Sequence, residues 1–261
     1  FSVPPDRITD SLTKIGPVDV VLFCVKTYDT ETAAQQLSPV LTENTVIIPL
    51  QNGIESEEKI RKIITKATVY GGVAYISSRI TAPGEITETG GAQRIAFGLM
   101  DGTVTGRAKE ILAAFQNAGI NTELKTDIIK ALWQKLIFIT TMGAFTAVTR
   151  LTQGEILDTP RSMELIFDAM KEVETIAHAK GIGLDPLNRE QVIAGMKRYD
   201  PKTRSSMYFD LVNEKPLEIE ALNGAVVRLG KELGVPTPIH QTIYAALLPY
   251  HLKHSRNSTR T

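Results

Sequence analysis

The segment Asp19-Val20-Val21-Leu22-Phe23-Cys24-Val25 decides the fold class of this sequence. Its apolar residues follow one another without polar alternation, which is typical of a strand covered on both faces in a parallel sheet. Two more short apolar segments lie at 45–50 and 67–73, and helical patterns at 31–41 and 55–64 separate the three. Strands that alternate with helices predict βαβ units, and hence a doubly wound parallel sheet.

The pattern changes between residues 75 and 97. Short segments separated by Pro83-Gly84 and Gly90-Gly91 predict antiparallel edge strands, with a turn at each of the two dipeptides. A helix over 105–118 and a strand over 121–124 are expected to complete this first domain.

The remaining sequence reads as helix. Residues 128–148 are too apolar on every side for a surface helix, so we expect this helix to be buried through its middle. Pro160 is expected to start a long amphipathic helix that ends at Gly181. The apolar positions of that helix are Leu165, Ile166, Ala169, Met170, Val173, Ile176 and Ala177. Further helices are expected after the polar segment 202–207, from Pro216, and over 239–252. The sequence therefore predicts an α/β domain over residues 1–125 and an all-helical domain over residues 126–261.

Composition narrows the class of protein. The 29 basic and 29 acidic residues cancel, so bulk charge favours neither nucleic acid nor an anionic membrane as a partner. Cys24 is the single cysteine, which excludes an intrachain disulfide and fits a reducing cytoplasm. No signal peptide is visible, and polar residues interrupt the longest apolar run. We therefore expect a cytoplasmic globular protein with no membrane partner and no metal site.

Lys135 is the one charge in the interior of the apolar helix after Lys130. Burial disfavours the charged form of a lysine and lowers its pKa, which makes Lys135 a candidate proton donor. Alternatively, its stem lies on apolar neighbours while its ammonium stays in water. The helix alone leaves both interpretations open.

Polar residues follow two of the expected strands. Lys26 comes after the first strand, and Asn52 comes after the second, beside Gly53. Ligands of open parallel sheets bind outside the carboxyl ends of the strands, so these residues are candidates for cofactor contacts. The phosphate-binding pattern G-x-G-x-x-G is absent from the 261 residues.

Six segments carry a more specific signal. They are Val25-Lys26-Thr27-Tyr28-Asp29-Thr30, Gln51-Asn52-Gly53, Gly71-Gly72-Val73-Ala74-Tyr75-Ile76, Leu132-Trp133-Gln134-Lys135-Leu136, Ser205-Ser206-Met207 and Glu218. In this order and spacing, the set resembles the ketopantoate reductase family, the NADPH-dependent 2-dehydropantoate 2-reductases. The resemblance covers essentially the whole chain. It implies that residues 1–125 are a Rossmann-like NADP-binding domain without its first, glycine-rich βαβ unit, and that residues 126–261 are a helical substrate and dimerisation domain.

The resemblance also implies roles for single residues. Lys135 would be the general acid that protonates the developing alkoxide, and Glu218 would lie near Lys135 and the nicotinamide ribose. Asn52 would contact both cofactor and substrate, and Ile76 would hold the carboxamide through its backbone. Lys26 would lie near the cofactor.

The substrate carboxylate is expected at the segment that follows Arg204. The resemblance implies that Ser206 and Met207 hold this carboxylate, with Ser205 adjacent. Two alternatives stay open: Ser206 acts only as a helix N-cap, and Glu218 is a solvated acid in the first turn of a helix.

One departure concerns the substrate. The family places asparagines four and eight residues after the lysine, where they bind the substrate carboxylate and hydroxyls, but this sequence has Ile139 and Gly143 there. Thr140 and Thr141 are neighbours that point elsewhere on a regular helix, and a further family asparagine corresponds to Thr152 or Gln153. Loss of groups that pair with hydroxyls weakens discrimination for a hydroxylated substrate. The reaction type is therefore better supported than the substrate.

Three hypotheses result. The first is an NADPH-dependent reductase of a 2-keto acid, with 2-dehydropantoate as the leading substrate and a possible homodimer as the assembly. The second is a related hydroxyacid or opine-type dehydrogenase with another substrate. The third is a catalytically silent chain, such as a dimeric helical scaffold or a fragment without its cofactor site.

Overall fold

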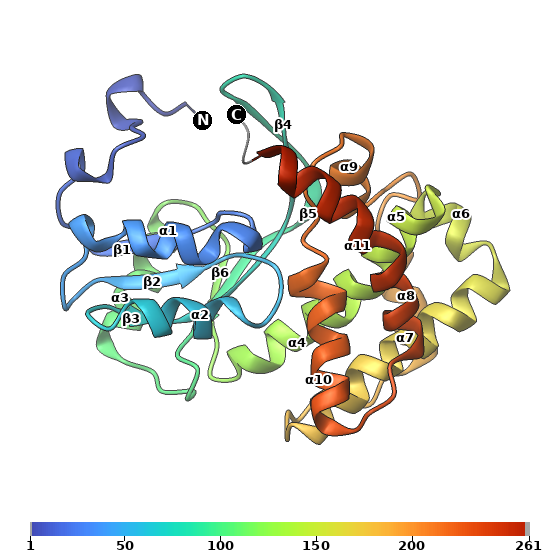
Figure 1. The fold of residues 1–261 in the computed structure, drawn as a ribbon. Coiled ribbons are helices and arrows are strands. Elements are labelled where there is room, and N and C mark those ends of the chain that lie inside the picture. Colours follow the sequence, from blue (N-terminus) through green and yellow to red (C-terminus); the bar gives the residue numbers. More distant parts are fainter. Residues whose placement is uncertain (1, 259–261) are drawn as a thin grey trace. The chain divides into compact units, whose positions relative to one another are not determined.

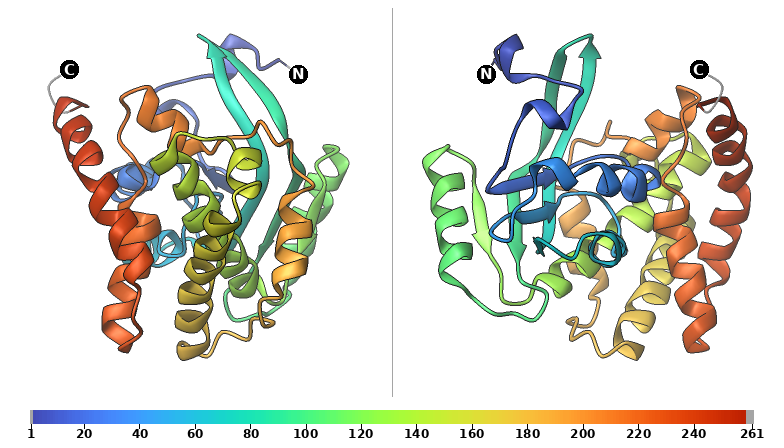
Figure 2. Two further views of the ribbon diagram at one scale, coloured as in Figure 1. Left: turned by 90° about the vertical axis from the view of Figure 1, so that its right-hand side faces the viewer. Right: turned by 60° about the vertical axis from the view of Figure 1, so that its left-hand side comes forward.

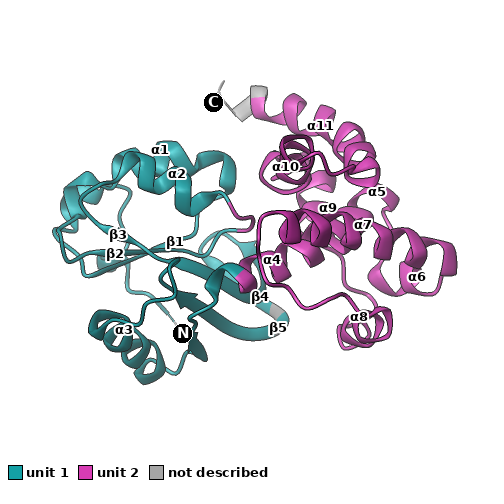
Figure 3. Ribbon diagram, turned by 90° about the horizontal axis from the view of Figure 1, so that it is seen from below, with its two compact units in different colours: residues 1–51, 55–129 teal, residues 52–54, 130–261 magenta. Residues whose placement is uncertain are grey.

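The structure is a computed structural model that describes residues 2–258 (Figure 1). The chain forms two compact units, one of residues 1–51 and 55–129 and the other of residues 52–54 and 130–261 (Figure 3). The first unit is an α/β unit with a parallel sheet, and the described elements that follow it are helices. This confirms the predicted fold class.

The parallel sheet of the first unit has the order β1-β2-β3. Its strands are β1 (Val20–Phe23), β2 (Val46–Pro49) and β3 (Thr68–Val69), and they alternate with α1 (Thr30–Gln36) and α2 (Ser56–Ile63). The register pairs Val20 with Val46 and Val46 with Thr68. Because the strands are parallel, the loops after β1 and β2 leave the sheet at the same edge.

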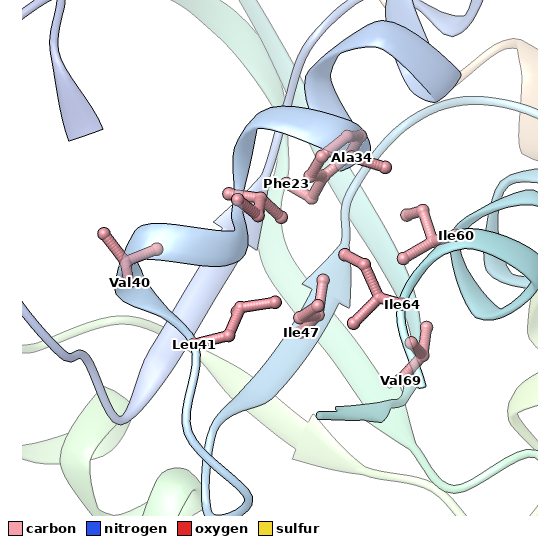
Figure 4. Close-up of a cluster of buried hydrophobic side chains, with 9 residues drawn as sticks. Phe23, Ala34, Val40, Leu41, Ile47, Ile60, Ile64 and Val69 are labelled. Carbon is pink, nitrogen blue, oxygen red and sulfur yellow. The ribbon is translucent and has the colours of Figure 1, made fainter. Parts of the chain in front are cut away.

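Two apolar layers hold this sheet. On one face, Ile47 packs with Phe23 and with Ala34 and Ile60 from α1 and α2 (Figure 4). On the other face, Val46 and Ile48 pack with Phe97, Ile111 and Phe115. Alternate residues of β2 thus enter opposite cores, as the period of a strand requires.

Strand β1 is less covered than we expected. Leu22 is 44% exposed, and β1 pairs only with β2 among the described strands. The prediction of two fully covered faces was therefore wrong for β1, because a strand at the edge of a sheet packs against fewer neighbours.

A second sheet follows, of order β4-β5-β6. It consists of β4 (Gly71–Ala82), β5 (Glu85–Gly98) and β6 (Thr122–Leu124), and α3 (Gly106–Asn117) precedes β6. Figure 2 shows β4 and β5 as one long hairpin, which turns at Pro83-Gly84. The predicted turn at Gly90-Gly91 was wrong: both residues lie within β5, where register shifts in the hairpin accommodate them.

The predicted strand over 67–73 is divided between two sheets. It breaks at Tyr70, after which β4 passes the carboxyl end of β2. A side chain on Gly72 would collide with the carbonyl oxygen of Pro49, so glycine permits this close approach. Gly72 therefore serves close backbone packing, whereas a Cβ on Gly71 would meet the side chains of Met100 and Ile128.

The remaining elements are helical. They are α4 (Ile128–Phe138), the π-helical turn η5 (Ile139–Gly143), α5 (Ala144–Thr149), α6 (Gln153–Leu157), α7 (Pro160–Ala179), α8 (Arg189–Met196), α9 (Ser206–Val212), the π-helical turn η6 (Glu220–Gly224), α10 (Ala225–Leu233) and α11 (Pro238–Ser258). Helix α7 starts at Pro160 as predicted, but Leu165 is 45% exposed and does not belong to its buried stripe.

The stretch Ile128–Thr149 is long and apolar enough to cross a membrane by length and composition, contrary to our expectation. However, 67% of its most apolar window is buried inside the structure. A core helix of a globular protein has this combination of apolar sequence and burial.

Candidate functional site

Lys135 lies on α4, whose residues before and after it are mostly buried. Leu132, Trp133 and Leu136 are each less than 5% exposed, and Lys135 itself is half-buried. Burial lowers the pKa of Lys135 to about 8, while the negative charge of Glu218 acts in the opposite direction. A lysine with such a pKa exchanges its proton near neutral pH, which is the property of a general acid or base.

Glu218 is buried between two apolar residues. It is 8% exposed, and Leu217 and Ile219 on either side are fully buried. The nearby Glu220 is exposed and pairs with Arg228 at 3.0 Å and with the hydroxyl of Tyr244 at 2.7 Å. The alternative of a solvated helix acid therefore describes Glu220, whereas Glu218 acts electrostatically on Lys135.

Asn52 reaches Glu218 through a tight loop. Its Nδ2 atom donates a long hydrogen bond of 3.5 Å to Glu218 Oε2. Gly53 has a φ of +98°, and a Cβ atom there would lie 3.1 Å from the carbonyl oxygen of Ala221. Only glycine adopts this conformation so close to another backbone without strain. The second unit thus brings together three predicted site residues: Lys135, Glu218 and Asn52.

The segment expected to hold the substrate carboxylate has mixed properties. Ser205 is the N-cap of α9: its Oγ accepts from Tyr208 N, donates to Gly143 O at 2.7 Å, and lies 2.8 Å from Thr146 Oγ1. These three contacts use the hydrogen-bonding capacity of a hydroxyl. Met207 is 4% exposed, whereas Ser206 is exposed. Ser206 is thus the residue of this segment whose side chain is accessible, and it is not the N-cap.

Thr140 and Thr141, which neighbour the position of the first missing asparagine, do not replace its side chain functionally. Thr140 Oγ1 donates to Leu136 O at 2.8 Å, and Thr141 Oγ1 donates to Ile137 O at 2.6 Å. Both residues are fully buried. Gly143 has room for a side chain, because a Cβ there would meet only Ser205 Cβ, at 3.8 Å. The positions four and eight residues after Lys135 therefore offer an apolar side chain and space.

In the first unit, Lys26 lies in a loop that the side chain of Gln51 holds in place by hydrogen bonds. Gln51 Nε2 donates to Val25 O at 2.8 Å and to Thr30 Oγ1 at 2.9 Å. Thr30 Oγ1 in turn donates to Thr27 O at 2.9 Å. The residues on both sides of Lys26 are thereby fixed to the end of β2. This role of Gln51 was not predicted, although its place directly after a predicted buried strand was a usable signal.

Ile76 lies at an irregularity of the β4–β5 hairpin. In the described register, Tyr75 pairs with Arg94 and Ser77 pairs with Gly90, and Ile76 has no cross-strand partner. Its side chain is 55% exposed. Bulges of this kind are frequent near active sites, where they free or redirect backbone groups.

The first unit offers groups that suit a cofactor at the carboxyl ends of its strands. Lys26 places a cation at the carboxyl end of β1, in extended conformation, and Ile76 offers backbone groups outside the regular register. The 261 residues contain no glycine-rich turn of the phosphate-binding pattern. The groups present, a cation after β1 and backbone groups outside the regular register, could contact a dinucleotide at this edge of the sheet. Among residues 2–258, no group of three His, Cys, Asp or Glu side chains could hold a metal ion.

Known proteins are similar to this chain in sequence and architecture. Residues 1–102 match the family described as ketopantoate reductase PanE/ApbA, and residues 127–251 match that described as ketopantoate reductase PanE/ApbA C terminal. A 2-dehydropantoate 2-reductase of Aquifex aeolicus is 32% identical over 252 residues, which cover 93% of this chain and 80% of that protein. That of Archaeoglobus fulgidus is 31% identical, covering 86% of this chain and 74% of that protein.

Solved structures agree with the sequence matches. A PanE/ApbA family ketopantoate reductase from Ralstonia eutropha superposes with a TM-score of 0.85 at 29% identity, covering 95% of this chain and 80% of that one. A dimeric ketopantoate reductase from Staphylococcus aureus gives 0.79 at 25% identity, covering 92% and 79%. A D-mandelate dehydrogenase bound to NADH and anilino(oxo)acetate gives 0.81 at 22% identity, covering 95% and 79%, which shows a shared fold. The chain therefore belongs to the ketopantoate reductase family of oxidoreductases.

Proposed function

We propose that this protein reduces a 2-keto acid to the 2-hydroxy acid with NADPH, and that Lys135 is the general acid. The leading substrate is 2-dehydropantoate, the substrate in the names of the relatives. The observation that supports the proposal best is the half-buried Lys135 with a pKa of about 8 beside a buried carboxylate, Glu218. A lysine with this pKa can donate a proton to an alkoxide near neutral pH.

When bound, NADPH supplies the hydride that adds to the keto carbon. The charged Lys135 ammonium donates a proton to the carbonyl oxygen as the carbon–oxygen double bond becomes a single bond. The products are the 2-hydroxy acid, NADP⁺ and a neutral Lys135, which takes up a proton from solvent before the next turnover. Glu218 favours the charged form of Lys135, and Asn52 orients the Glu218 carboxylate.

The remaining contacts are assigned by their place in the fold. In the first unit, Lys26 and the backbone of Ile76 hold the cofactor. In the second unit, the exposed Ser206 binds the substrate carboxylate. Ser205, as the N-cap of α9, and the buried Met207 fix the backbone on either side of it. We accordingly assign cofactor binding to residues 1–125, and substrate binding and dimerisation to residues 126–261. We further propose a homodimer, because one family member is described as dimeric. A cytoplasmic location is proposed on the single cysteine, which fits a reducing compartment.

A comparison of two lysines on the same helix tests the role of Lys135. Lys130 is five residues upstream and pairs with Asp185 at 3.0 Å. We expect Lys135→Ala to lose most of kcat for NADPH oxidation with 2-dehydropantoate, at nearly unchanged NADPH affinity, since a proton donor acts on the transition state. Lys130→Ala should retain activity. Equal loss of NADPH binding in Lys135→Ala would contradict the assignment.

A second candidate function is a dehydrogenase for a more apolar 2-keto acid. Ile139 and the space at Gly143 favour it, because a pocket without the asparagines has lost the groups that recognise hydroxyls. A panel of 2-keto acids with hydroxylated, aliphatic and aromatic side chains, assayed with NADPH and with NADH, decides between the two. Ile139→Asn should improve the turnover of 2-dehydropantoate. If it does not, the altered pocket is not the cause of any weak activity with that substrate.

A further inference from the structure

We infer that Asn223 is a positioning residue that fixes Glu218 relative to Lys135 by tying together the two π-helical turns η5 and η6. This inference rests on the proposed function of the Lys135–Glu218 pair. It assigns a task to a residue that the sequence analysis treated only as part of a helix.

The contact itself is short and buried. Asn223 Nδ2 donates to Thr140 O at 2.9 Å, and both residues are fully buried. Asn223 belongs to η6, which begins two residues after Glu218, and Thr140 belongs to η5, which begins four residues after Lys135. One side-chain hydrogen bond therefore joins the segments that carry the two charged groups.

The π-helical geometry makes this junction specific. In η6, Gly224 N bonds to Ile219 O five residues back, at 2.8 Å. Such a turn contains one residue more than an α-helical turn and shifts the side chains that follow it. Single π-helical turns are rare and occur frequently at functional sites. Here two of them meet, each close to one member of the proposed catalytic pair.

Thr140 is a firm anchor for this bond. Its Oγ1 atom donates to Leu136 O at 2.8 Å, and His240 Nε2 lies 3.4 Å from Thr140 Oγ1. His240 is fully buried, and its Nδ1 atom lies 2.7 Å from Glu172 Oε2. The Glu172 carboxylate also accepts from the backbone N–H groups of Ile239 and His240, in the first turn of α11. These contacts connect the turn η5 to α7 and α11, and the Asn223 hydrogen bond connects η6 to η5.

A different residue of η6, Ala221, approaches the loop of Asn52. The backbone of Gly53 approaches Ala221 O so closely that a Cβ would lie at 3.1 Å, and Asn52 reaches Glu218 at 3.5 Å. A displacement of η6 would therefore change both contacts of Glu218 at once: the hydrogen bond with Asn52 and the electrostatic interaction with Lys135.

A contribution to stability alone does not explain the choice of asparagine. Asn223 Oδ1 is buried and has no hydrogen-bond partner among the described residues. A buried polar atom without a partner costs free energy, which offsets what the Nδ2 bond contributes. An asparagine in such a place fits a requirement for one specific alignment of η5 and η6.

Three substitutions in the paired turns separate positioning from stability. Asn223→Leu keeps the size of the side chain and removes the donor, and Thr141→Val removes a buried hydrogen bond that lies within its own helix. Asn223→Ser is a milder alternative that cannot span the 2.9 Å contact without a shift. Thermal unfolding of each variant shows that it folds and how much stability it has lost.

The readout is the pKa of Lys135, which is measured by an NMR pH titration of ¹³Cε-labelled lysine. The Lys135 signal is assigned by its absence from the spectrum of Lys135→Arg. We expect the pKa to fall in Asn223→Leu and Asn223→Ser, because Glu218 moves away, and to stay unchanged in Thr141→Val. With 2-dehydropantoate and NADPH, kcat should fall on the order of tenfold to a hundredfold in the Asn223 variants, at unchanged NADPH affinity.

A wild-type pKa in a folded Asn223 variant would overturn the inference, as would a kcat that falls in proportion to lost stability in all three variants. The NMR titration needs no turnover. An absence of 2-keto acid reduction in the wild type would therefore refute the proposed function, while the titration would still decide whether Asn223 sets the coupling of Lys135 and Glu218.

Discussion

Removal of the Glu218 charge should shift the pH dependence of the reaction downward. Burial moves the pKa of Lys135 from 10.5 to about 8, a difference that corresponds to about 3 kcal/mol against the charged form. Glu218 opposes this effect, so Glu218→Gln leaves the burial and removes the opposition. The pKa of Lys135 should then lie below 8.

The direction of the rate follows from which form of Lys135 donates the proton. In the wild type, kcat/KM for reduction should be constant at neutral pH and fall about tenfold for each pH unit above 8, as charged Lys135 is lost. In Glu218→Gln the same decrease should begin at lower pH. For each unit by which the pKa falls, activity on the descending limb should decrease about tenfold.

The assay is steady-state NADPH oxidation between pH 6 and 10 with 2-dehydropantoate, and a stability measurement at each pH excludes unfolding. Glu220→Gln is the matched control, because Glu220 is a nearby acid that is exposed and pairs with Arg228. It should keep the wild-type midpoint. An unchanged or higher midpoint in Glu218→Gln would refute the assignment of Glu218 as the group that keeps Lys135 charged.

Three further predictions concern stability. First, the difference in unfolding free energy between the wild type and Lys135→Met should change by about 3 kcal/mol in favour of the wild type between pH 8 and 10.5, because native Lys135 loses its proton at lower pH than the unfolded chain does. Urea titrations at both pH values measure this difference, and a difference that does not change with pH would contradict the prediction. Second, burial raises the pKa of Glu57 to about 7, so at pH 8 the native protein holds a buried charge that Glu57→Gln removes. The variant should be more stable than the wild type by up to about 3 kcal/mol at pH 8 and equally stable near pH 4, where Glu57 is neutral; thermal unfolding at both pH values measures this. Gly53→Ala should cost about 1–2 kcal/mol because of its positive φ, and should lower kcat because Asn52 moves. A fully active and equally stable Gly53→Ala would show that the loop tolerates a side chain there.

Local pattern predicted the parallel strands and the long helices well. The apolar segments that became β1, β2 and α7 carry their period or length in the sequence, and proline marks where α7 begins. The errors arose where tertiary contacts decide. Leu22 and Leu165 are apolar residues whose positions are exposed, and the β4–β5 hairpin absorbs a glycine pair that reads locally as a turn.

The site required more than local pattern. Lys135 attracted attention as a charge in an apolar helix, but its connection to Glu218, more than eighty residues later, came from the resemblance to a family. Asn223 was missed because its partner is the backbone carbonyl of Thr140, which leaves no trace in the sequence. The place of Gln51 after a strand could have drawn attention to it, but its partners, Val25 O and Thr30 Oγ1, could not be read from the sequence. The π-helical turns were missed for a related reason: one extra residue in a helical turn does not alter composition.

Transfer of a labelled hydride tests the central claim most directly. Purified protein is incubated with 2-dehydropantoate, and in parallel with each other 2-keto acid of the panel, and with NADPH that carries deuterium at the transferable C4 position; the product is analysed by mass spectrometry. The wild type and Lys130→Ala should yield 2-hydroxy acid with one deuterium at C2, and Lys135→Ala should yield it far more slowly at equal NADPH occupancy. Label transfer at the wild-type rate in Lys135→Ala, or no transfer by the wild type to any 2-keto acid of the panel, would contradict the account.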